Sequence, residues 1–258
     1  MTQTLWGRLV ACGGLPGRLA VPASAAILLL LAACSRPAAS PPPLAARAFG
    51  AAIAEVGGGK QIGSIGAALE QPIVVQVNDA QGAAVAGALV EVHTAGGAVA
   101  TPDAGLTGAD GQLTSVVTLG GSAGRYQIVA ATRDKSGKPV ELRLDEIALG
   151  YQQQQGRVLN DRYCSRCHDT ESTPERVSNH DNLNAKPHGF TEGAVLNAMS
   201  DADLAAIIGY GGPALSKSPE MPPYGYTLNK ADVDALIAYI RAVADPPYRA
   251  KGLTYAKN

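Results

Sequence analysis

The sequence has few aromatic residues. Aromatic side chains make up 5% of the 258 residues, with a single Trp and two Phe. Aromatic rings supply much of the buried area in large cores, so Ala, Val, Leu and Ile must fill most of the interior here. This composition argues against one large core and predicts two domains with modest cores.

The sequence also lacks an apolar run long enough to span a bilayer comfortably. The longest such run, residues 19–33, has 15 residues, whereas a membrane helix needs about 20. It follows Arg8 and Arg18, no acidic residue precedes it, and it ends in small residues. These features predict an export signal rather than a membrane-spanning helix.

The end of this run, "LAAC", resembles the lipobox of bacterial lipoproteins. The resemblance implies that Cys34 becomes the lipidated first residue of the mature protein and anchors it to a membrane. Ser35, which follows the cysteine, favours the outer membrane by the same analogy. The alternative is an ordinary signal peptide that is cut near Ala33 and leaves a free thiol.

Cysteine is scarce as well, and this limits its uses. Of the four cysteines, Cys12 would leave with the signal and Cys34 would carry lipid. Only Cys164 and Cys167 then remain, in an oxidising compartment. A structural disulfide elsewhere in the chain is therefore excluded.

An excess of basic charge is missing too. The formal net charge is -1, and removal of Arg8 and Arg18 leaves 19 basic against 22 acidic residues. No basic stripe is present, so we expect no nucleic-acid partner.

Changes in composition divide the chain into segments. Residues 35–50 are rich in Pro and Ala, which predicts an extended tether that reaches about 50 Å at about 3.1 Å per residue. The predicted segments are a lipoprotein signal peptide at 1–33, a tether at 34–60, a β-sandwich at 61–149, a helical domain at 150–246 and a C-terminal tail at 247–258.

Alternating apolar residues predict the sandwich. Ile73, Val75 and Val77 share one face, as do Val140, Leu142 and Leu144, and turn sequences separate the runs. We expect six or seven strands in two antiparallel sheets. The stretches "VNDAQGAAVAGALVEV", "TGADGQLTSVVTL" and "AGRYQIVAAT" resemble the immunoglobulin-like domains of bacterial surface adhesins.

Tyr126 and His93 have predicted positions in this domain. The resemblance places Tyr126 where such sandwiches often have a tyrosine corner. His93 is the domain's one histidine and follows Val92 in the alternation, so we expect it on the solvent face. No catalytic constellation is visible in this segment.

The helical segment contains "DRYCSRCHDT". The residues before it carry no proline, so a helix can run into the motif and place Cys164, Cys167 and His168 on one side within a turn. This spacing predicts covalent attachment of a c-type haem. A thioredoxin-like redox pair would need a preceding strand, and a structural zinc site would need further cysteines.

A distal ligand is predicted at Met221. It precedes Pro222 and Pro223, which favour an extended, stiff backbone. Three rivals are weighed against it: Met199, His180 and His188. Met199 lies just before a helix cap, and the two histidines fall in a polar loop.

These features together resemble a class I cytochrome c over residues 151–245. The resemblance implies that His168 and Met221 hold the iron of one haem c, and that the first and last helices cross near Gly156 and Tyr239. It departs from the family at Asn160, where an aromatic residue is common. The proline whose carbonyl would orient His168 is left open between Pro174 and Pro187.

Two helices are predicted independently by their first residues. Ser200 with Asp203, and Asn229 with Asp232, have the spacing of helix caps, and each precedes an apolar stripe. The expected architecture is therefore multidomain, with an all-β immunoglobulin-like sandwich followed by an all-α cytochrome c domain.

The function expected from these features is single-electron transfer between redox partner proteins of the cell envelope. The protein would be an electron carrier rather than an enzyme, exported and lipid-anchored, in the periplasm or at the outer membrane or cell surface. One alternative is a haem-based sensor or peroxidase-like enzyme with an open iron position. Another is a surface protein whose immunoglobulin-like domain docks a partner.

Overall fold

The structure is a computed structural model that describes residues 48–170 and 177–250. The predicted signal peptide, Cys34, the first part of the tether, Pro174 and the end of the tail lie outside these residues. Within the described ranges, no helix has the length and apolar character needed to cross a membrane. Residues 46–258 form one compact unit.

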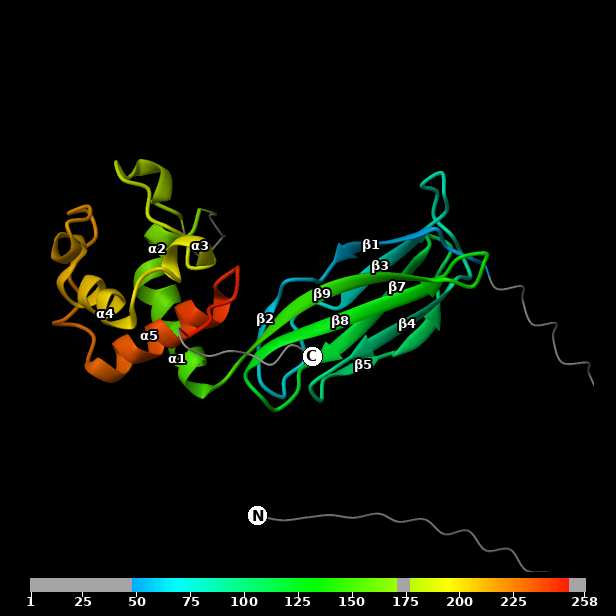
Figure 1. Cartoon of the computed structure of the whole chain (residues 1–258), viewed down its shortest axis with the longest axis horizontal. Coiled ribbons are helices and arrows are strands. Elements are labelled where there is room, and N and C mark those ends of the chain that lie inside the picture. The colour runs from blue at the N-terminus through cyan, green and yellow to red at the C-terminus, as the bar shows by residue number, and fades with distance from the viewer. Residues whose placement is uncertain (1–47, 171–176, 251–258) are drawn as a thin grey trace, which may run out of the picture. The chain divides into compact units, whose positions relative to one another are not determined.

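The first half of this unit is a sandwich of two β-sheets (Figure 1). One sheet has the strand order β1-β3-β7-β5 and the other β2-β9-β8-β4-β6. Every pairing between neighbours is antiparallel except the parallel pair β2 and β9. The described strands are β1 Ala52–Gly57, β2 Ile62–Ser64, β3 Ile73–Asn78, β4 Leu89–Thr94, β5 Val99–Thr101, β6 Ala104–Leu106, β7 Gln112–Thr118, β8 Gly124–Arg133 and β9 Pro139–Leu149.

Alternation along the strands builds the core of the sandwich. In β3, Ile73, Val75 and Val77 are buried while their neighbours are only partly covered. In β4, Val92 is buried and His93 is exposed, as predicted. Each side chain of this kind contributes about 1.5–3 kcal/mol when fully buried, so these alternating runs account for much of the domain's stability.

The sandwich begins earlier than the predicted boundary at residue 61. Strand β1 lies inside the predicted tether and pairs with β3, with Ile53 opposite Val77. Because β1 is an edge strand with a single buried side chain, its alternation is too weak to recognise in the sequence. Strands β2, β5 and β6 have three residues each, which explains why fewer strands were predicted.

Tyr126 forms the local bond expected of a tyrosine corner. Its side chain is buried, and its hydroxyl donates to the carbonyl of Ser122 at 2.8 Å. The amide of Ser122 donates back to the same hydroxyl at 3.3 Å. The ring lies against Gly96, where a Cβ would come within 2.9 Å of it.

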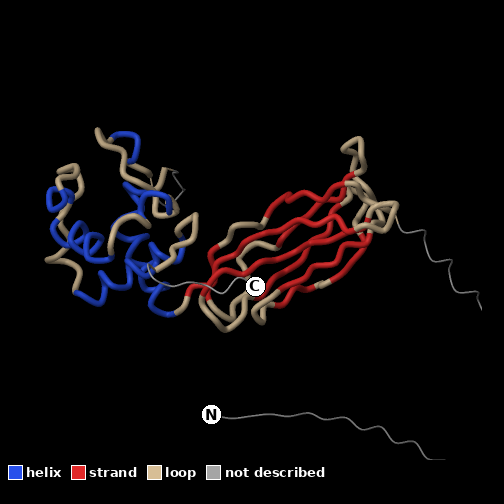
Figure 2. Tube along the Cα trace, in the orientation of Figure 1, coloured by secondary structure: helices blue, strands red, loops and turns tan. Residues whose placement is uncertain are grey.

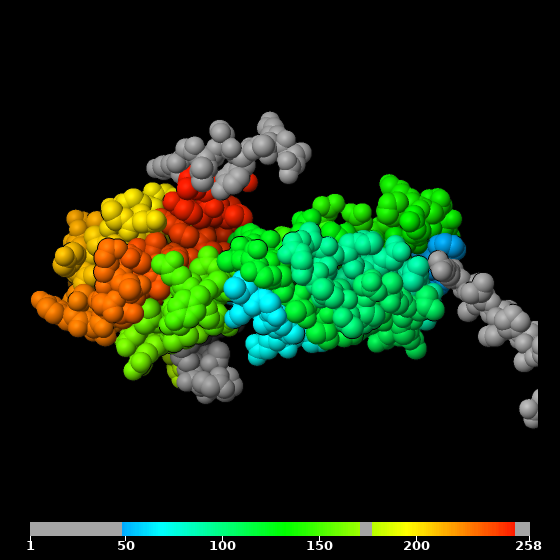
Figure 3. Space-filling model, turned by 90° about the horizontal axis from the view of Figure 1, so that it is seen from below, coloured from blue at the N-terminus to red at the C-terminus, as the bar shows by residue number. Residues whose placement is uncertain are grey.

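The second half of the unit is helical (Figure 2). Helices α4 and α5 contact one another along an apolar cluster. Figure 3 shows the surface of this half, coloured from green through yellow to red along the chain. The helical elements are α1 Tyr151–Leu159, the π-helical turn η1 Asn160–Cys164, α2 Ser165–His168, the 3-10 turn η2 His180–Asn182, α3 Gly193–Leu196, α4 Asp201–Tyr210, the 3-10 turn η3 Gly212–Leu215 and α5 Lys230–Val243.

The predicted caps of α4 and α5 are confirmed. The hydroxyl of Ser200 accepts from the amide of Asp203 at 3.1 Å, and the side chain of Asn229 accepts from the amide of Asp232 at 3.1 Å. In both helices the acidic side chain bonds back to the amide of the capping residue. These reciprocal bonds satisfy amides that a helix start would otherwise leave unpaired.

Helices α1 and α5 cross at Gly156, as predicted. A Cβ at this position would collide with the carbonyl of Ala235 and lie 2.7 Å from the Cβ of Tyr239. Only glycine therefore allows the two backbones to approach this closely.

The end of strand β9 packs against the helices. Ile147 and Leu149 form a buried cluster with Tyr239 and Val243 of α5. Arg125 of β8 also donates to the carbonyl of Ala244 at 2.6 Å. The last four residues of β9 are all buried because the helices cover the face that alternation would otherwise leave in solvent.

Candidate haem-binding site

The cysteine motif lies on a helix that changes its winding. The predicted helix does run into the motif, and it continues from α1 to His168 through a π-helical turn. The amide of Ser165 bonds to the carbonyl of Asn160, five residues back, while its hydroxyl donates to the carbonyl of Asp161 at 3.0 Å. This side-chain bond competes with regular α-helical bonding. The turn ends at Cys164, and α2 carries Cys167 and His168.

Both cysteines are free thiols and half-buried. Cys164 packs against the apolar cluster of the helical half. Burial raises its pKa to about 12, and the nearby Cys167 and Asp161 add to this shift. A redox-active pair needs a lowered thiol pKa, so this environment argues against the thioredoxin-like alternative.

His168 is arranged as a neutral imidazole with one nitrogen available. Its Nδ1 lies 2.7 Å from the carbonyl oxygen of His188, which can only accept, so Nδ1 carries the proton. Burial lowers the pKa of His168 and favours the neutral ring. The lone pair of Nε2 is then available to a metal ion. The ring also packs against Phe190, with centroids 4.7 Å apart.

The carbonyl on Nδ1 of His168 belongs to His188 and not to the predicted Pro187, which is one residue earlier. The other predicted proline, Pro174, lies outside the described residues. The acceptor is 20 residues along the chain from His168. Sequence spacing alone could not select it because the intervening segment forms loops rather than a regular element.

Met221 lies in a loop held closely against the end of α4. Its carbonyl accepts from the amide of Gly212 at 3.1 Å, and further along the loop the amide of Gly225 donates to the carbonyl of Gly209 at 2.9 Å. Gly211 has a φ of 80°, and a Cβ there would come within 2.7 Å of the carbonyl of Met221. Glycines therefore let this loop approach the helix.

The structure brings Met221 and Cys164 into the same apolar cluster, with Leu204, Ile208 and Leu236 among its buried members. The rival Met199 also packs against this cluster. Met221 as the distal ligand therefore stays a prediction from the sequence.

The two rival histidines bond to carboxylates. The ring of His180 lies 3.0 Å from Asp181, and that of His188 lies 2.9 Å from Glu192. In each ring it is Nδ1 that makes this contact.

Several residues at this site escaped sequence analysis. Tyr224 donates its hydroxyl to the carbonyl of Tyr163 at 3.0 Å, next to the first cysteine. Burial raises its pKa, and Cys164 and Cys167 contribute. Phe190, Glu192 and Glu220 were also missed. The four-residue spacing of His188 and Glu192 was the one signal in the sequence for these contacts. Tyr224 gave no such signal, because its partner Tyr163 is 61 residues away.

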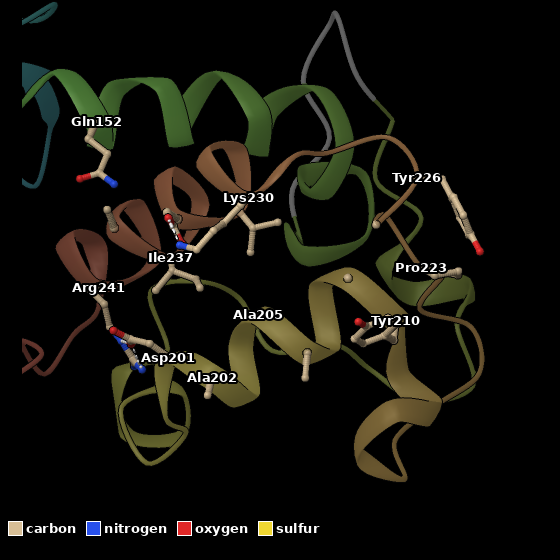
Figure 4. A pocket seen from close by; sticks show the side chains of 16 residues that line it. Gln152, Asp201, Ala202, Ala205, Tyr210, Pro223, Tyr226, Lys230, Ile237 and Arg241 are labelled. Carbon is tan, nitrogen blue, oxygen red and sulfur yellow. Dashed lines mark hydrogen bonds and ion pairs between the residues drawn. The ribbon is translucent and has the colours of Figure 1, made fainter.

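A groove of about 1100 Å³ lies between α4 and α5 (Figure 4). Small side chains such as Ala202 and Ala205 line one wall, and Ile237 lies on the other. Arg241 pairs with Asp201 at 2.8 Å on its rim. None of the four residues predicted to hold the haem, Cys164, Cys167, His168 and Met221, lines this groove. The groove is therefore separate from the predicted haem site.

Comparison with known families concerns the helical half. Residues 152–240, about a third of the chain, match the family model described as "Cytochrome C oxidase, cbb3-type, subunit III". This stretch is thus similar to a cytochrome c domain of the cbb3 type, and the match implies covalently bound haem c with iron. The donor set of two free thiols and a neutral imidazole fits this group.

Comparison with solved structures concerns the sandwich. The D00-D0 domain of intimin matches 38% of this chain and 46% of its own length, with 16% identity and a TM-score of 0.30. Invasin, a bacterial integrin-binding protein, matches 37% and 18%, with 23% identity and a TM-score of 0.27. The Escherichia coli adhesin FdeC matches 37% and 30%, with 19% identity and a TM-score of 0.26.

The chain thus spans less than half the length of each of these adhesin structures. The sandwich is assigned from its own strand order and buried alternation rather than from these neighbours. No curated protein matched the chain.

Proposed function

We propose that this protein is a lipid-anchored, mono-haem electron carrier of the cell envelope. One observation carries the proposal. The half-buried thiols of Cys164 and Cys167 lie on the same short helical stretch as a neutral His168 whose Nδ1 is already bonded. Such a set provides two attachment points and one imidazole ligand. When bound, the haem iron supplies a one-electron couple.

The residues around the site have separate tasks in this proposal. Cys164 and Cys167 would attach the group covalently, and His168 and Met221 would ligate its iron. The carbonyl of His188 orients the imidazole and increases its basicity. The apolar cluster against which Cys164 and Met221 pack would limit the access of water to this group.

Ligation by Met221 would separate this function from the sensor or peroxidase alternative. With Met221 bound, the iron would have no open position for a peroxide or a gas. Met221 lies in the same cluster as Cys164, and glycine contacts hold its loop against α4. We therefore favour electron transfer without substrate turnover.

The location belongs to the same proposal. A cytochrome c domain implies an exported protein, and the "LAAC" sequence supports lipid attachment at Cys34. Redox partners would meet the protein in the envelope. The sandwich would join the tether to the haem domain, since it follows the tether in the chain and its strand β9 packs directly against α5.

The test is maturation of the full chain in a host that attaches haem c. We expect the added mass of one haem on the protein and a haem spectrum that persists after reduction and denaturation. Met221→Ala should keep the covalent haem and lose the near-infrared charge-transfer band of the oxidised protein. A chain that matures without added haem would end the electron-carrier proposal, and rapid cyanide binding by the unaltered protein would favour the peroxidase alternative.

A further inference from the structure

One loop segment contacts both a predicted iron ligand, His168, and the residue next to the other predicted ligand, Met221. We call residues 184–189, between η2 and Phe190, the strap. At its start, Glu220, the residue before Met221, accepts from the strap. Its carboxylate receives the side-chain amide of Asn184 at 2.8 Å, the backbone amide of Asn184 at 3.1 Å and that of Ala185 at 3.2 Å.

The other end of the strap lies on the histidine side. The carbonyl of His188 accepts from Nδ1 of His168 at 2.7 Å. Glu192 holds this end in place, because its carboxylate receives the amide of Gly189 at 2.8 Å and lies 2.9 Å from Nδ1 of His188. The position of the acceptor carbonyl is thus fixed by an acidic side chain.

The middle of the strap is also fastened. The ammonium group of Lys186 donates to the carbonyls of Asp181 at 2.7 Å and Leu183 at 2.9 Å. These carbonyls belong to η2 and the residue after it, where unpaired acceptors are expected. The strap is therefore bonded at its start, middle and end.

The loop of Met221 has few strong bonds of its own, so the bonds from the strap to Glu220 matter for its position. The amide of Met221 reaches the carbonyl of Ser218 at a long 3.4 Å, and Ser216 has a left-handed backbone with a φ of 53°. Within the loop, Ser218 Oγ accepts from the amide of Glu220 at 3.2 Å. The bonds from Glu220 to the strap add contacts from a segment 35–36 residues away.

We propose that Glu220 is a positioning residue for the Met221 thioether. It ties the methionine loop to the strap, whose far end holds the imidazole of His168, so the two axial ligands are coupled through one segment. This inference rests on the proposed haem function. Glu220 does not touch the iron; it limits how far the methionine loop can move away from the site.

The test uses the full-length, haem-loaded protein and Glu220→Gln. Glutamine keeps the size of the side chain but places an NH₂ group against amide donors, so the bonds to Asn184 and Ala185 weaken. We expect added imidazole to displace the methionine about tenfold more readily, a magnitude typical of lost second-layer bonds at metal sites. The charge-transfer band should weaken while the covalent haem content stays unchanged.

Asp234→Asn is the matched control. It removes the same charge from the same domain, but the half-buried Asp234 pairs with Lys230 of α5, at 2.6 Å, and not with the strap. Its imidazole affinity should equal that of the unaltered protein. An equal change in both variants would mean that net charge acts, and it would overturn the positioning role.

A second pair of variants tests the contact itself. Asn184→Asp places a carboxylate against Glu220, so it should loosen the methionine loop and weaken the charge-transfer band. Adding Glu220→Gln to this variant should restore the band, because the glutamine amide can donate to the new carboxylate. Absence of this rescue would contradict the coupling. If haem is attached and methionine-ligated but Glu220→Gln changes nothing, the inference fails while the proposed function stands.

Discussion

Glu146 in strand β9 is the buried charged residue of the described chain. Its side chain is 0% exposed, and one carboxylate oxygen accepts from the amide of Gln61 at 2.6 Å. Its other oxygen, Oε1, has no hydrogen-bond partner among the described residues. The pKa of Glu146 is raised to about 7. Burial is the largest cause, and the nearby Glu55 and Asp145 contribute in the same direction. The neutral acid is therefore the form that suits this position.

A pH dependence of stability follows from this pKa. The folded protein holds the Glu146 proton up to about pH 7, whereas the unfolded chain releases it near the ordinary glutamate pKa of 4.5. The stabilisation is thus complete below pH 4.5 and is lost as the pH rises to about 7, by about 3 kcal/mol at most. Denaturant unfolding of Glu146→Gln, which imitates the neutral acid, should show a smaller decline over this range.

Glu141→Gln is the control for that measurement. Glu141 lies on the exposed side of the same strand and bonds to Arg143. Its variant should keep the decline of the unaltered protein. A decline that persists equally in Glu146→Gln would show that the buried carboxyl is not its source.

The crossing of helices α1 and α5 shapes the helical half. Helices α1 and α5 make extensive contact, and their approach depends on the missing side chain of Gly156. The apolar cluster beside the predicted ligands includes Leu236 and Ile240 of α5 and Leu159 of α1. The crossing thus supports the wall of the haem site rather than only the stability of the helices.

Gly156→Ala should destabilise the helical half. The added methyl group collides with the carbonyl of Ala235, and overpacking of this kind costs about 1–3 kcal/mol. The measurement is the midpoint of thermal unfolding of the haem-loaded protein, followed in the haem absorbance. Gly209→Ala in α4 is the control, because a Cβ there meets nothing within 4 Å. Its unfolding midpoint should stay equal or rise, since alanine favours a helix by up to about 1 kcal/mol.

If Gly156→Ala unfolds at the same temperature as the unaltered protein, the two helices must separate without cost. That outcome would contradict the close crossing described above.

At the scale of the whole chain, a strand-rich half and a helical half follow a segment in which the sequence predicts a lipid anchor. Within residues 46–258, the two folded halves share the cluster of Ile147, Leu149, Tyr239 and Val243. Arg157 of α1 donates to the carbonyl of Ile62 at 2.8 Å, and Arg125 donates to that of Ala244. These contacts join the end of the sandwich to the helices at several points.

Cell fractionation tests the anchor at this scale. Cys34→Ser should release the protein from the membrane fraction into the soluble envelope fraction, because the predicted lipid attachment is lost. Cys12→Ser is the matched control, since Cys12 would leave with the signal peptide. Membrane retention of Cys34→Ser, with the haem content unchanged, would contradict lipid anchoring and leave the electron-carrier proposal intact.

The sequence by itself determined features that depend on near neighbours. The cysteine spacing, the caps at Ser200 and Asn229 and the alternation of β3 follow from residues within a turn or a strand of each other. Such local patterns need no knowledge of the fold. The glycine at position 156 was also read correctly, through a resemblance to a family.

Only the tertiary structure decided which distant groups complete the site. The carbonyl on His168, the bonds from Glu220 to Asn184 and the place of β1 in its sheet all depend on segments brought together by folding. Loop geometry has no period that a sequence could display, so these partners could not be chosen in advance. Folding places them because the packing of other segments brings amide donors and carbonyl or carboxylate acceptors within hydrogen-bond distance of each other.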